Sequence, residues 1–416
     1  MSLLLLFTVV SVLTTAAFLA LMARQAGTVL RHRGAVPAGF ATEVSLEEHQ
    51  KAADYERARL GLRAAGAVVG LATGLVWAWA GYDLLFGAIA GQMGPGLGRG
   101  VAFVIMVEVV STVVGLPLAL IGTFGVERRF GFNRTTLGRF LADRVKGAVL
   151  GLVLGVPLLF GLLWLMRLQG AWWFWVWAGL VVLMFAMTEA FPRFIAPLFN
   201  KFSPLEGELR ARIEGLLQRC GFEAAGLFVM DASKRSAHGN AYFTGLGRSK
   251  RIVLFDTLIA KNSAAELEAV LAHELGHFKL NHIWSGMGRS VVILFAGCFA
   301  LGVLSHQDWL LPSFGIAHRD DALSLMVCVV LLQMAGPVLS IGANWISRKH
   351  EYQADDFARR MVGAEPMASA LVRLSRDNAS TLTPDPLYAL VNYSHPPVPL
   401  RVARLRVSEK GTALSA

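Results

Sequence analysis

Charged side chains are scarce in this chain of 416 residues: aspartate, glutamate, lysine and arginine together make up 16% of it. Soluble domains carry about 25%. Hydrophobic residues make up 55%, and the mean hydropathy is +0.52. This composition excludes an ordinary soluble protein and indicates a polytopic membrane protein with a smaller soluble part.

Cysteine is also scarce, with only Cys220, Cys298 and Cys328. The last two lie in apolar runs, and no C-x-x-C or other paired spacing occurs. The sequence therefore predicts neither a disulfide framework nor a zinc site built on cysteine. No internal repeat or low-complexity tract is present.

No lysine or arginine precedes the first apolar run, residues 2–22, while three arginines follow it. Because a signal peptide begins with positive charge, we expect an uncleaved first span with its N-terminus outside. We expect seven spans in all, each close to the roughly 20 residues that a bilayer requires. They cover residues 2–22, 64–90, 100–124, 147–166, 171–192, 285–305 and 323–345, and Pro337 is expected to kink the last one.

The net charge of +10 is concentrated in the loops after spans one, three, five and seven. Basic residues favour cytoplasmic loops, so we interpret the surplus as a topology signal, with the C-terminus inside. We do not interpret it as a nucleic-acid surface, and no nucleic-acid partner is expected. A row of tryptophans at residues 172–177 fits the outer end of span five, as in an aromatic belt.

The strongest local motif is the H-E-x-x-H pattern of His273, Glu274 and His277. On a helix, positions four apart share a face, so both imidazoles can bind one ion. The glutamate between them can reach a water at that ion, which is the arrangement of a zinc peptidase. The spacing of Ser263 and Glu266 predicts a capping box at the start of the required helix.

Within that helix, Gly276 is the one weak helix former. We attribute it to a close approach of metal or backbone. The polar stretch before the motif predicts an amphipathic helix at 205–220. It also predicts short strands at 227–230, 240–243 and 251–255.

A catalytic zinc takes three protein ligands and keeps one position open, so a third ligand must come from elsewhere in the chain. The segment SRKHEYQADDFARR after span seven offers Glu351 and Asp355, four residues apart. One can bind the metal while the other orients a ligand imidazole. A solvated helix face is the alternative reading of this pair.

HELGH, a transmembrane hairpin, SRKHEYQAD and NYSHPP follow one another in this order. Together with RFGFNRTT and SKRSAHGNAYFTG, they resemble the integral-membrane type I CAAX prenyl proteases, which are zinc metalloendopeptidases of the gluzincin kind. The resemblance covers nearly the whole chain. It implies a mainly α fold, in which seven transmembrane helices enclose a chamber and carry a small α+β zinc metallopeptidase domain.

The resemblance also implies one zinc ion per chain, held by His273, His277 and Glu351. Glu274 would then be the catalytic base, and Asp355 would be a partner of the ligands. These roles match the chemistry that the motif alone predicts.

Three further roles rest on the resemblance. Asn240, in GNAYF, resembles the edge-strand residue that holds the substrate backbone. The segment SHPPVPLR contains His395 and Arg401, which resemble residues that contact the substrate carbonyl and the transition state. We count His395 with the catalytic residues. Without the resemblance, Asn240 reads as a turn residue and His395 as a structural histidine before proline.

Other polar residues near these motifs have simpler interpretations. His282, one turn after the H-E-x-x-H pattern, reads as a helix-end cap. Glu108 lies within span three, where it either lines the chamber or makes a hydrogen bond between helices. His238 and His350 receive no role.

We expect four regions along the chain. Residues 1–192 form the N-terminal membrane region, and residues 193–284 the first part of the peptidase domain. Residues 285–345 form spans six and seven, and residues 346–416 the second part of the peptidase domain with the third zinc ligand.

The favoured function is hydrolysis of peptide bonds near the C-terminus of prenylated or membrane-associated proteins. The alternatives are a broader quality-control protease without a prenyl requirement and a non-catalytic carrier or scaffold. A shorter stress-response protease has too few spans, and an intramembrane site-two protease would bury its motif within a span. We expect a monomer in the lipid bilayer, in a bacterial inner membrane or, in a eukaryote, the endoplasmic reticulum, with its site on the cytoplasmic side.

Overall fold

The computed structural model describes residues 2–168, 170–245 and 250–413. Six of the described helices are long and apolar enough to cross a membrane, and a bent helix pair makes seven if it counts as one span. The predicted number of spans is therefore confirmed. The spans are α1 (Leu3–Arg31), α2 to α3 (Leu46–Ala90), α4 with its π-helical end (Leu97–Glu127), α5 (Leu137–Met166), α6 to Leu198 (Trp172–Leu198), α10 (His282–Leu304) and the pair α11 (Asp321–Gln333) and α12 (Gly336–Val362).

The seventh span bends by 50° between α11 and α12. Pro337 lies in the first turn of α12, where it has no N–H to donate to the end of α11. The predicted kink is thus confirmed. Beyond it, α12 runs without a break to Val362, so the last membrane helix continues directly into the region expected to form the peptidase domain, called the peptidase part below.

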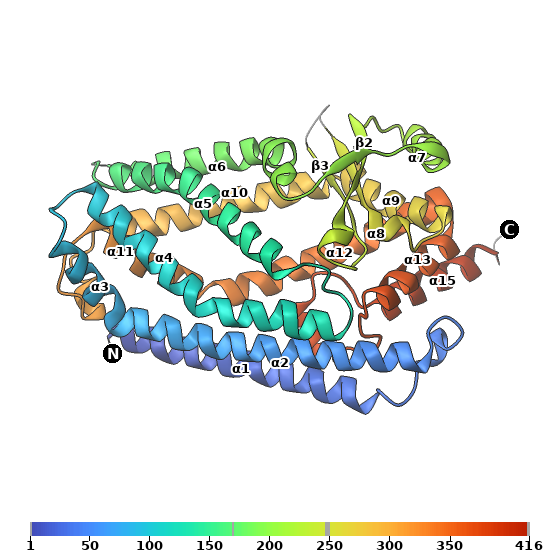
Figure 1. The fold of residues 1–416 in the computed structure, drawn as a ribbon, viewed down its shortest axis with the longest axis horizontal. Helices are drawn as coiled ribbons and strands as arrows, with labels where there is room; N and C mark the ends of the chain where they lie inside the picture. The colour runs from blue at the N-terminus through green and yellow to red at the C-terminus, as the bar shows by residue number, and fades with distance from the viewer. Residues whose placement is uncertain (1, 169, 246–249, 414–416) are drawn as a thin grey trace.

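The membrane helices form an elongated body with the peptidase elements at one end (Figure 1). Helices α1 and α2 pack side by side along one edge, and α6 and α10 along the opposite edge. A cavity of about 1650 Å³ lies between α2, α4, α5 and the peptidase elements, and Glu108 is among the residues that line it. The structure therefore favours the chamber-lining interpretation of Glu108.

The peptidase part contains a four-stranded sheet of order β1-β2-β4-β3. Strands β2 (Gly226–Met230) and β4 (Arg251–Phe255) are parallel, while β1 (Phe202–Pro204) and β3 (Ala241–Thr244) pair antiparallel at the two edges. The three predicted strands and the amphipathic helix α7 (Gly207–Arg219) are confirmed, and β1 was not predicted. The helices of this part are α8 (Asp256–Ile259), α9 (Ala264–Lys279), α13 (Ala364–Asp377), α14 (Pro386–Asn392) and α15 (Val398–Ala413).

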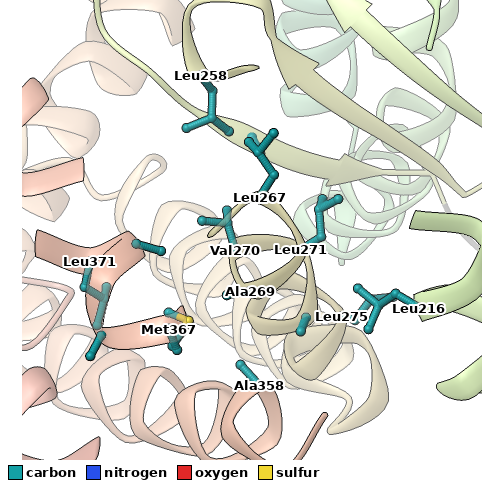
Figure 2. Packing of buried hydrophobic residues seen from close by; sticks show 14 of the residues in the cluster. Leu216, Leu258, Leu267, Ala269, Val270, Leu271, Leu275, Ala358, Met367 and Leu371 are labelled. Carbon is teal, nitrogen blue, oxygen red and sulfur yellow. The ribbon is translucent and has the colours of Figure 1, made fainter. Parts of the chain in front are cut away.

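Helix α9 is the centre of the peptidase core. Figure 2 shows its apolar side chains pointing to several neighbours, with Leu216 of α7 on one side and Met367 and Leu371 of α13 on another. Four apolar residues of α9 have no exposed surface at all: Ala269, Leu271, Ala272 and Leu275. Burial on several faces fixes the helix in position and rotation, so the side chains on its remaining face point in defined directions.

Gly276 allows the closest packing in this core. A Cβ built there would lie 3.0 Å from the Cα of Ala354 and 3.1 Å from the Cβ of Phe357, both on α12. The expected close approach of a backbone at Gly276 is therefore confirmed. It brings α9 against the continuation of the seventh span.

Replacing Gly276 with alanine tests this contact. Alanine would ordinarily stabilise a helix by about 1 kcal/mol relative to glycine. Because the new methyl group would overlap the backbone of α12, we expect G276A to destabilise the protein by about 1–3 kcal/mol instead. The measurement is the melting temperature of the detergent-solubilised protein, which should fall.

Gly215 of α7 is the matched control, because an added Cβ would meet only the end of the Arg219 side chain, at 3.7 Å. G215A should leave the melting temperature unchanged or raise it. A melting temperature of G276A at or above that of the wild type would contradict the proposed contact.

Candidate metal centre

The capping box anchors the N-terminus of α9. The hydroxyl of Ser263 accepts a hydrogen bond from the Glu266 N–H at 3.3 Å, and the Glu266 carboxylate accepts one from the Ser263 N–H at 2.8 Å. The second carboxylate oxygen of Glu266 accepts hydrogen bonds from Ser369 and Arg373 of α13. The predicted box is confirmed, and its glutamate also joins α9 to α13.

Three potential ligands converge on one point between α9 and α12. The Nε2 atoms of His273 and His277 lie 3.3 Å apart. Glu351 Oε1 lies 3.3 Å from His277 Nε2, and Glu351 Oε2 lies 3.4 Å from His273 Nε2. Ligand atoms bound about 2.1 Å from a tetrahedral ion are about 3.4 Å apart, so these positions fit a zinc ion.

The hydrogen bonding of Glu351 supports the same interpretation. Its side chain is 4% exposed, and its Oε2 atom is buried without a hydrogen-bond partner among the described residues. Arg401 Nη1 lies 3.1 Å from that oxygen as an ion pair. Buried carboxylate oxygens are rarely left without hydrogen bonds unless they bind a cation, so the residues present fit a metal.

The other nitrogen of each histidine has its own partner. His273 Nδ1 lies 3.0 Å from Asp355 Oδ1, and His277 Nδ1 lies 3.0 Å from His282 Nδ1. Such contacts orient the rings so that both Nε2 atoms point to the ion. Asp355, 1% exposed, thus lies where a partner of the ligands is expected.

His282 requires a correction. It is the first residue of α10, its ring contacts His277 and Gln353, and Asn281 precedes it with a left-handed backbone. The helix-cap interpretation is wrong, because this turn sends the ring back toward the ligands. No signal in the sequence predicted the contact of His282 with His277. The stacking of His350 on His282, with ring centroids 3.9 Å apart, was not predicted either.

The buried charges around the ligands are almost balanced. Arg401, 6% exposed, donates to both oxygens of Asp355 at 2.8 and 2.6 Å and also faces Glu351. Asp355 and Glu351 against one guanidinium leave one excess negative charge, to which an ionised Glu274 adds, and this excess suits a cation. Burial favours the neutral His273 ring, but Asp355 and Glu351 outweigh it and raise the pKa of His273 to about 9.

Glu274 faces a separate cleft of about 310 Å³, which His277, Tyr242 and Phe243 also line. Its carboxylate has no hydrogen bond or ion pair with another residue in the part of the chain that the structure describes. Burial raises the pKa of the Glu274 carboxyl. A free carboxylate with a raised pKa is suited to accept a proton and release it again.

His395 reaches the ligands from the loop between α14 and α15, with its Nε2 3.3 Å from Glu351 Oε1 and its side chain 65% exposed. The adjacent Tyr393 holds this loop in place. Its carbonyl accepts a hydrogen bond from Arg348, and its hydroxyl accepts one from the buried Gln25 of α1. His395 thus borders the ligands and remains open to a substrate.

Asn240 lies apart from this cluster. It immediately precedes the edge strand β3, its side chain accepts a hydrogen bond from the Ala241 N–H at 2.9 Å, and it lines the large cavity. The structure therefore joins seven of the eight predicted residues around one point or cleft and places Asn240 on the cavity wall. The seven are His273, Glu274, His277, Glu351, Asp355, His395 and Arg401.

Comparisons with known proteins agree with this arrangement. Residues 25–201 match the family model described as CAAX prenyl protease N-terminal, five membrane helices, and residues 204–409 match peptidase family M48. The chain is 35% identical to CAAX prenyl protease 1 of Saccharomyces cerevisiae, covering 90% of this chain and 89% of that protein. It is 31% identical to the human CAAX prenyl protease 1 homolog, covering 83% and 81%.

A solved structure is also similar. The crystal structure of S. mikatae Ste24p superimposes with a TM-score of 0.92 at 31% identity, covering 97% of this chain and 99% of that chain. The similarity therefore extends over membrane and peptidase parts together.

Replacing Asp355 with asparagine tests the support of the metal centre. The side chain keeps its size but loses the charge that pairs with His273 and Arg401, so we expect metal affinity to fall by about 10- to 100-fold. The measurement is zinc binding in competition with a chelator. Asp356→Asn is the matched control, because Asp356 pairs with Arg404 on the surface. Equal affinities for D355N and D356N would contradict a supporting role for Asp355.

Proposed function

Since this chain belongs to peptidase family M48 and is a multi-pass membrane metalloendopeptidase of the CAAX prenyl protease type, we propose the following roles for its residues. His273, His277 and Glu351 hold one zinc ion per chain, and Asp355 orients His273. The observation that carries this proposal is that one potential ligand atom from each of these three residues lies within 4.8 Å of the other two.

Bound zinc supplies Lewis-acid activation of a water and of the scissile carbonyl. Glu274 takes the proton of the attacking water on its carboxylate and delivers it to the leaving amine. Its lack of a hydrogen-bond or ion-pair partner within residues 2–168, 170–245 and 250–413 supports this, because a base engaged in an ion pair would first have to break it. His395, exposed beside Glu351, donates a hydrogen bond to the oxygen on which negative charge develops.

The substrate lies along β3. Asn240, just before the strand, lines the large cavity, whereas Tyr242 and Phe243 within it line the cleft of Glu274. The strand therefore leads from the cavity to the site. Within the described residues it is the last strand of the sheet, so its free edge can pair with an extended peptide. Asn240 would hold the peptide where it leaves the cavity.

The substrate is a peptide or protein whose C-terminal region is prenylated or inserted in the membrane. The curated relatives are named as CAAX prenyl proteases. The cavity walls contributed by α4 and α5 are largely apolar, which suits an isoprenoid or an apolar peptide segment. A carrier without catalysis is disfavoured, because it would not need a half-buried carboxylate beside three ligands that has no partner among the described residues.

The protein acts as a monomer, with its N-terminus outside and its site on the cytoplasmic side of a bacterial inner membrane. The endoplasmic reticulum is the eukaryotic alternative. The distribution of basic residues supports this orientation. The four regions 1–192, 193–284, 285–345 and 346–416 divide the chain functionally, although α12 crosses the last boundary as one helix.

Replacing Glu274 with glutamine tests the proposed chemistry. We expect E274Q to retain zinc but to lose at least about 1000-fold in kcat, because the amide cannot accept the proton. The measurement is cleavage of a farnesylated CAAX peptide, with zinc content determined by elemental analysis. Equal cleavage by E274Q and the wild type, or a wild type without zinc, would refute the mechanism.

The same peptide without its farnesyl group distinguishes the two protease hypotheses. Cleavage at a kcat/KM at least about tenfold lower, equivalent to about 1.4 kcal/mol, would support prenyl recognition. Equal rates would favour the quality-control alternative.

The orientation can be tested with reporters in a bacterial host. Because seven spans place the two termini on opposite sides of the membrane, the C-terminus should lie inside. Green fluorescent protein fused after Ala416 should therefore fluoresce, and alkaline phosphatase fused there should be inactive. Fusions within residues 91–96, between spans two and three, should show the opposite pattern. An active phosphatase at Ala416 would contradict the proposed orientation.

A further inference from the structure

The segment that leads into β3 is attached to the loop after the third membrane span. Asn133 of that loop and Ser236 form an isolated antiparallel bridge. The Arg134 N–H donates to the Arg235 carbonyl at 3.0 Å, and the Ala237 N–H donates to the Phe132 carbonyl at 3.0 Å. The start of the proposed substrate strand is thus joined to the membrane region by backbone contacts up to residue 237.

The next residues are held by Asn378, the C-cap of α13. The Gly239 N–H donates to Asn378 Oδ1 at 3.2 Å, and Asn378 Nδ2 donates to the Gly239 carbonyl at 3.3 Å. Because a backbone N–H is always a donor, these two bonds determine which end of the amide is the oxygen. The oxygen therefore faces residues 238 and 239.

His238 lies between this oxygen and a carboxylate of the membrane region. Its Nδ1 is 3.1 Å from Asn378 Oδ1, and its Nε2 is 3.3 Å from Glu127 Oε2. The Tyr55 hydroxyl lies 3.4 Å from the same Nε2, so both ring nitrogens have polar partners from other elements. The ring is also stacked on Phe132, with centroids 4.1 Å apart and planes 15° apart.

Glu127 is itself held by the membrane region. It lies at the end of the π-helical turn that completes the third span. Its Oε1 accepts a hydrogen bond from the hydroxyl of Tyr55, on α2, at 2.5 Å. The backbone carbonyl of His238 accepts a hydrogen bond from the Thr257 hydroxyl of α8 at 2.8 Å. One histidine thus connects α2, the third span, α8 and α13 at the start of β3.

We propose that His238 is a positioning residue that holds the start of β3, and with it Asn240, against the wall of the membrane cavity. The proposal rests on the function proposed above, in which β3 pairs with the substrate. His238 lines the large cavity together with Asn240, and no contact joins it to the ligands among the described residues. It therefore acts on substrate binding through the position of Asn240.

The test measures peptide binding separately from catalysis. A fluorescein-labelled farnesylated CAAX peptide is titrated into E274Q protein and into the same protein carrying His238→Phe. Phenylalanine keeps the stack on Phe132 and removes both ring nitrogens, which contact Asn378 and Glu127. We expect Kd to rise by about tenfold, the size of one charge-assisted hydrogen bond. In the active protein, H238F should raise KM similarly and leave kcat and zinc content within twofold of wild type.

Two further variants show whether the effect passes through the named residues. Glu127→Gln should raise Kd in the same direction, and E127Q combined with H238F should bind no more weakly than H238F alone. Asn240→Ala should also weaken binding, and adding H238F to it should cause no further loss.

His306→Phe is the matched control. His306 also contacts an aromatic ring and a backbone carbonyl, those of Trp172 and Met166, but at the far end of the membrane helices. The Kd of the H306F variant for the labelled peptide should stay within twofold of that of the parent E274Q protein.

Three results would overturn the proposal: an unchanged Kd for H238F, an equal rise for H306F, or a parallel loss of kcat and zinc in H238F. The last would make His238 a support of the metal centre. A wild type that cleaves no peptide would instead refute the proposed function, and the binding titration would still decide the role of His238.

Discussion

The close approach of two backbones at Gly276 determines the geometry of the site. A Cβ there would lie 3.0 Å from the Cα of Ala354, so no side chain larger than that of glycine fits at this position between α9 and α12. On α9, the proposed ligands His273 and His277 lie three residues before and one residue after Gly276. On α12, Glu351 lies three residues before Ala354. With the helix axes this close, short side chains from both helices reach one point.

The membrane hairpin holds this contact together. Helix α10 begins three residues after α9 ends, and α12 carries the seventh span straight into the segment with Glu351. Rotation of α12 would therefore move Glu351, while α10 fixes the end of α9 through the short turn that joins them. The third side of the site is held differently, because His395 lies on a loop. There, the buried Gln25 of α1 donates a hydrogen bond to the hydroxyl of Tyr393, so the first span supports the loop that carries His395.

Local signals in the sequence predicted much of this arrangement, and long-range packing explains what they missed. The H-E-x-x-H spacing and its capping box depend on helix geometry alone, so both were predictable. The spacing of Glu351 and Asp355 alone did not decide whether Glu351 binds the metal. Only the family resemblance predicted that it does. The ring of His282 could not be predicted, because its direction depends on the left-handed backbone of Asn281. Strand β1 was missed because its three residues, including a proline, carry no alternating pattern.

Arg401 shows how contacts refine a role that resemblance implies. Its guanidinium is buried and already donates to both oxygens of Asp355, while its Nη1 faces Glu351. Moving it to a substrate would leave two buried carboxylates without their partner, which would cost several kcal/mol. In this arrangement it therefore acts first on the ligands: it fixes Asp355, which fixes His273. Any contact with a substrate must be made by an N–H that these carboxylates leave free, with the guanidinium in its present place.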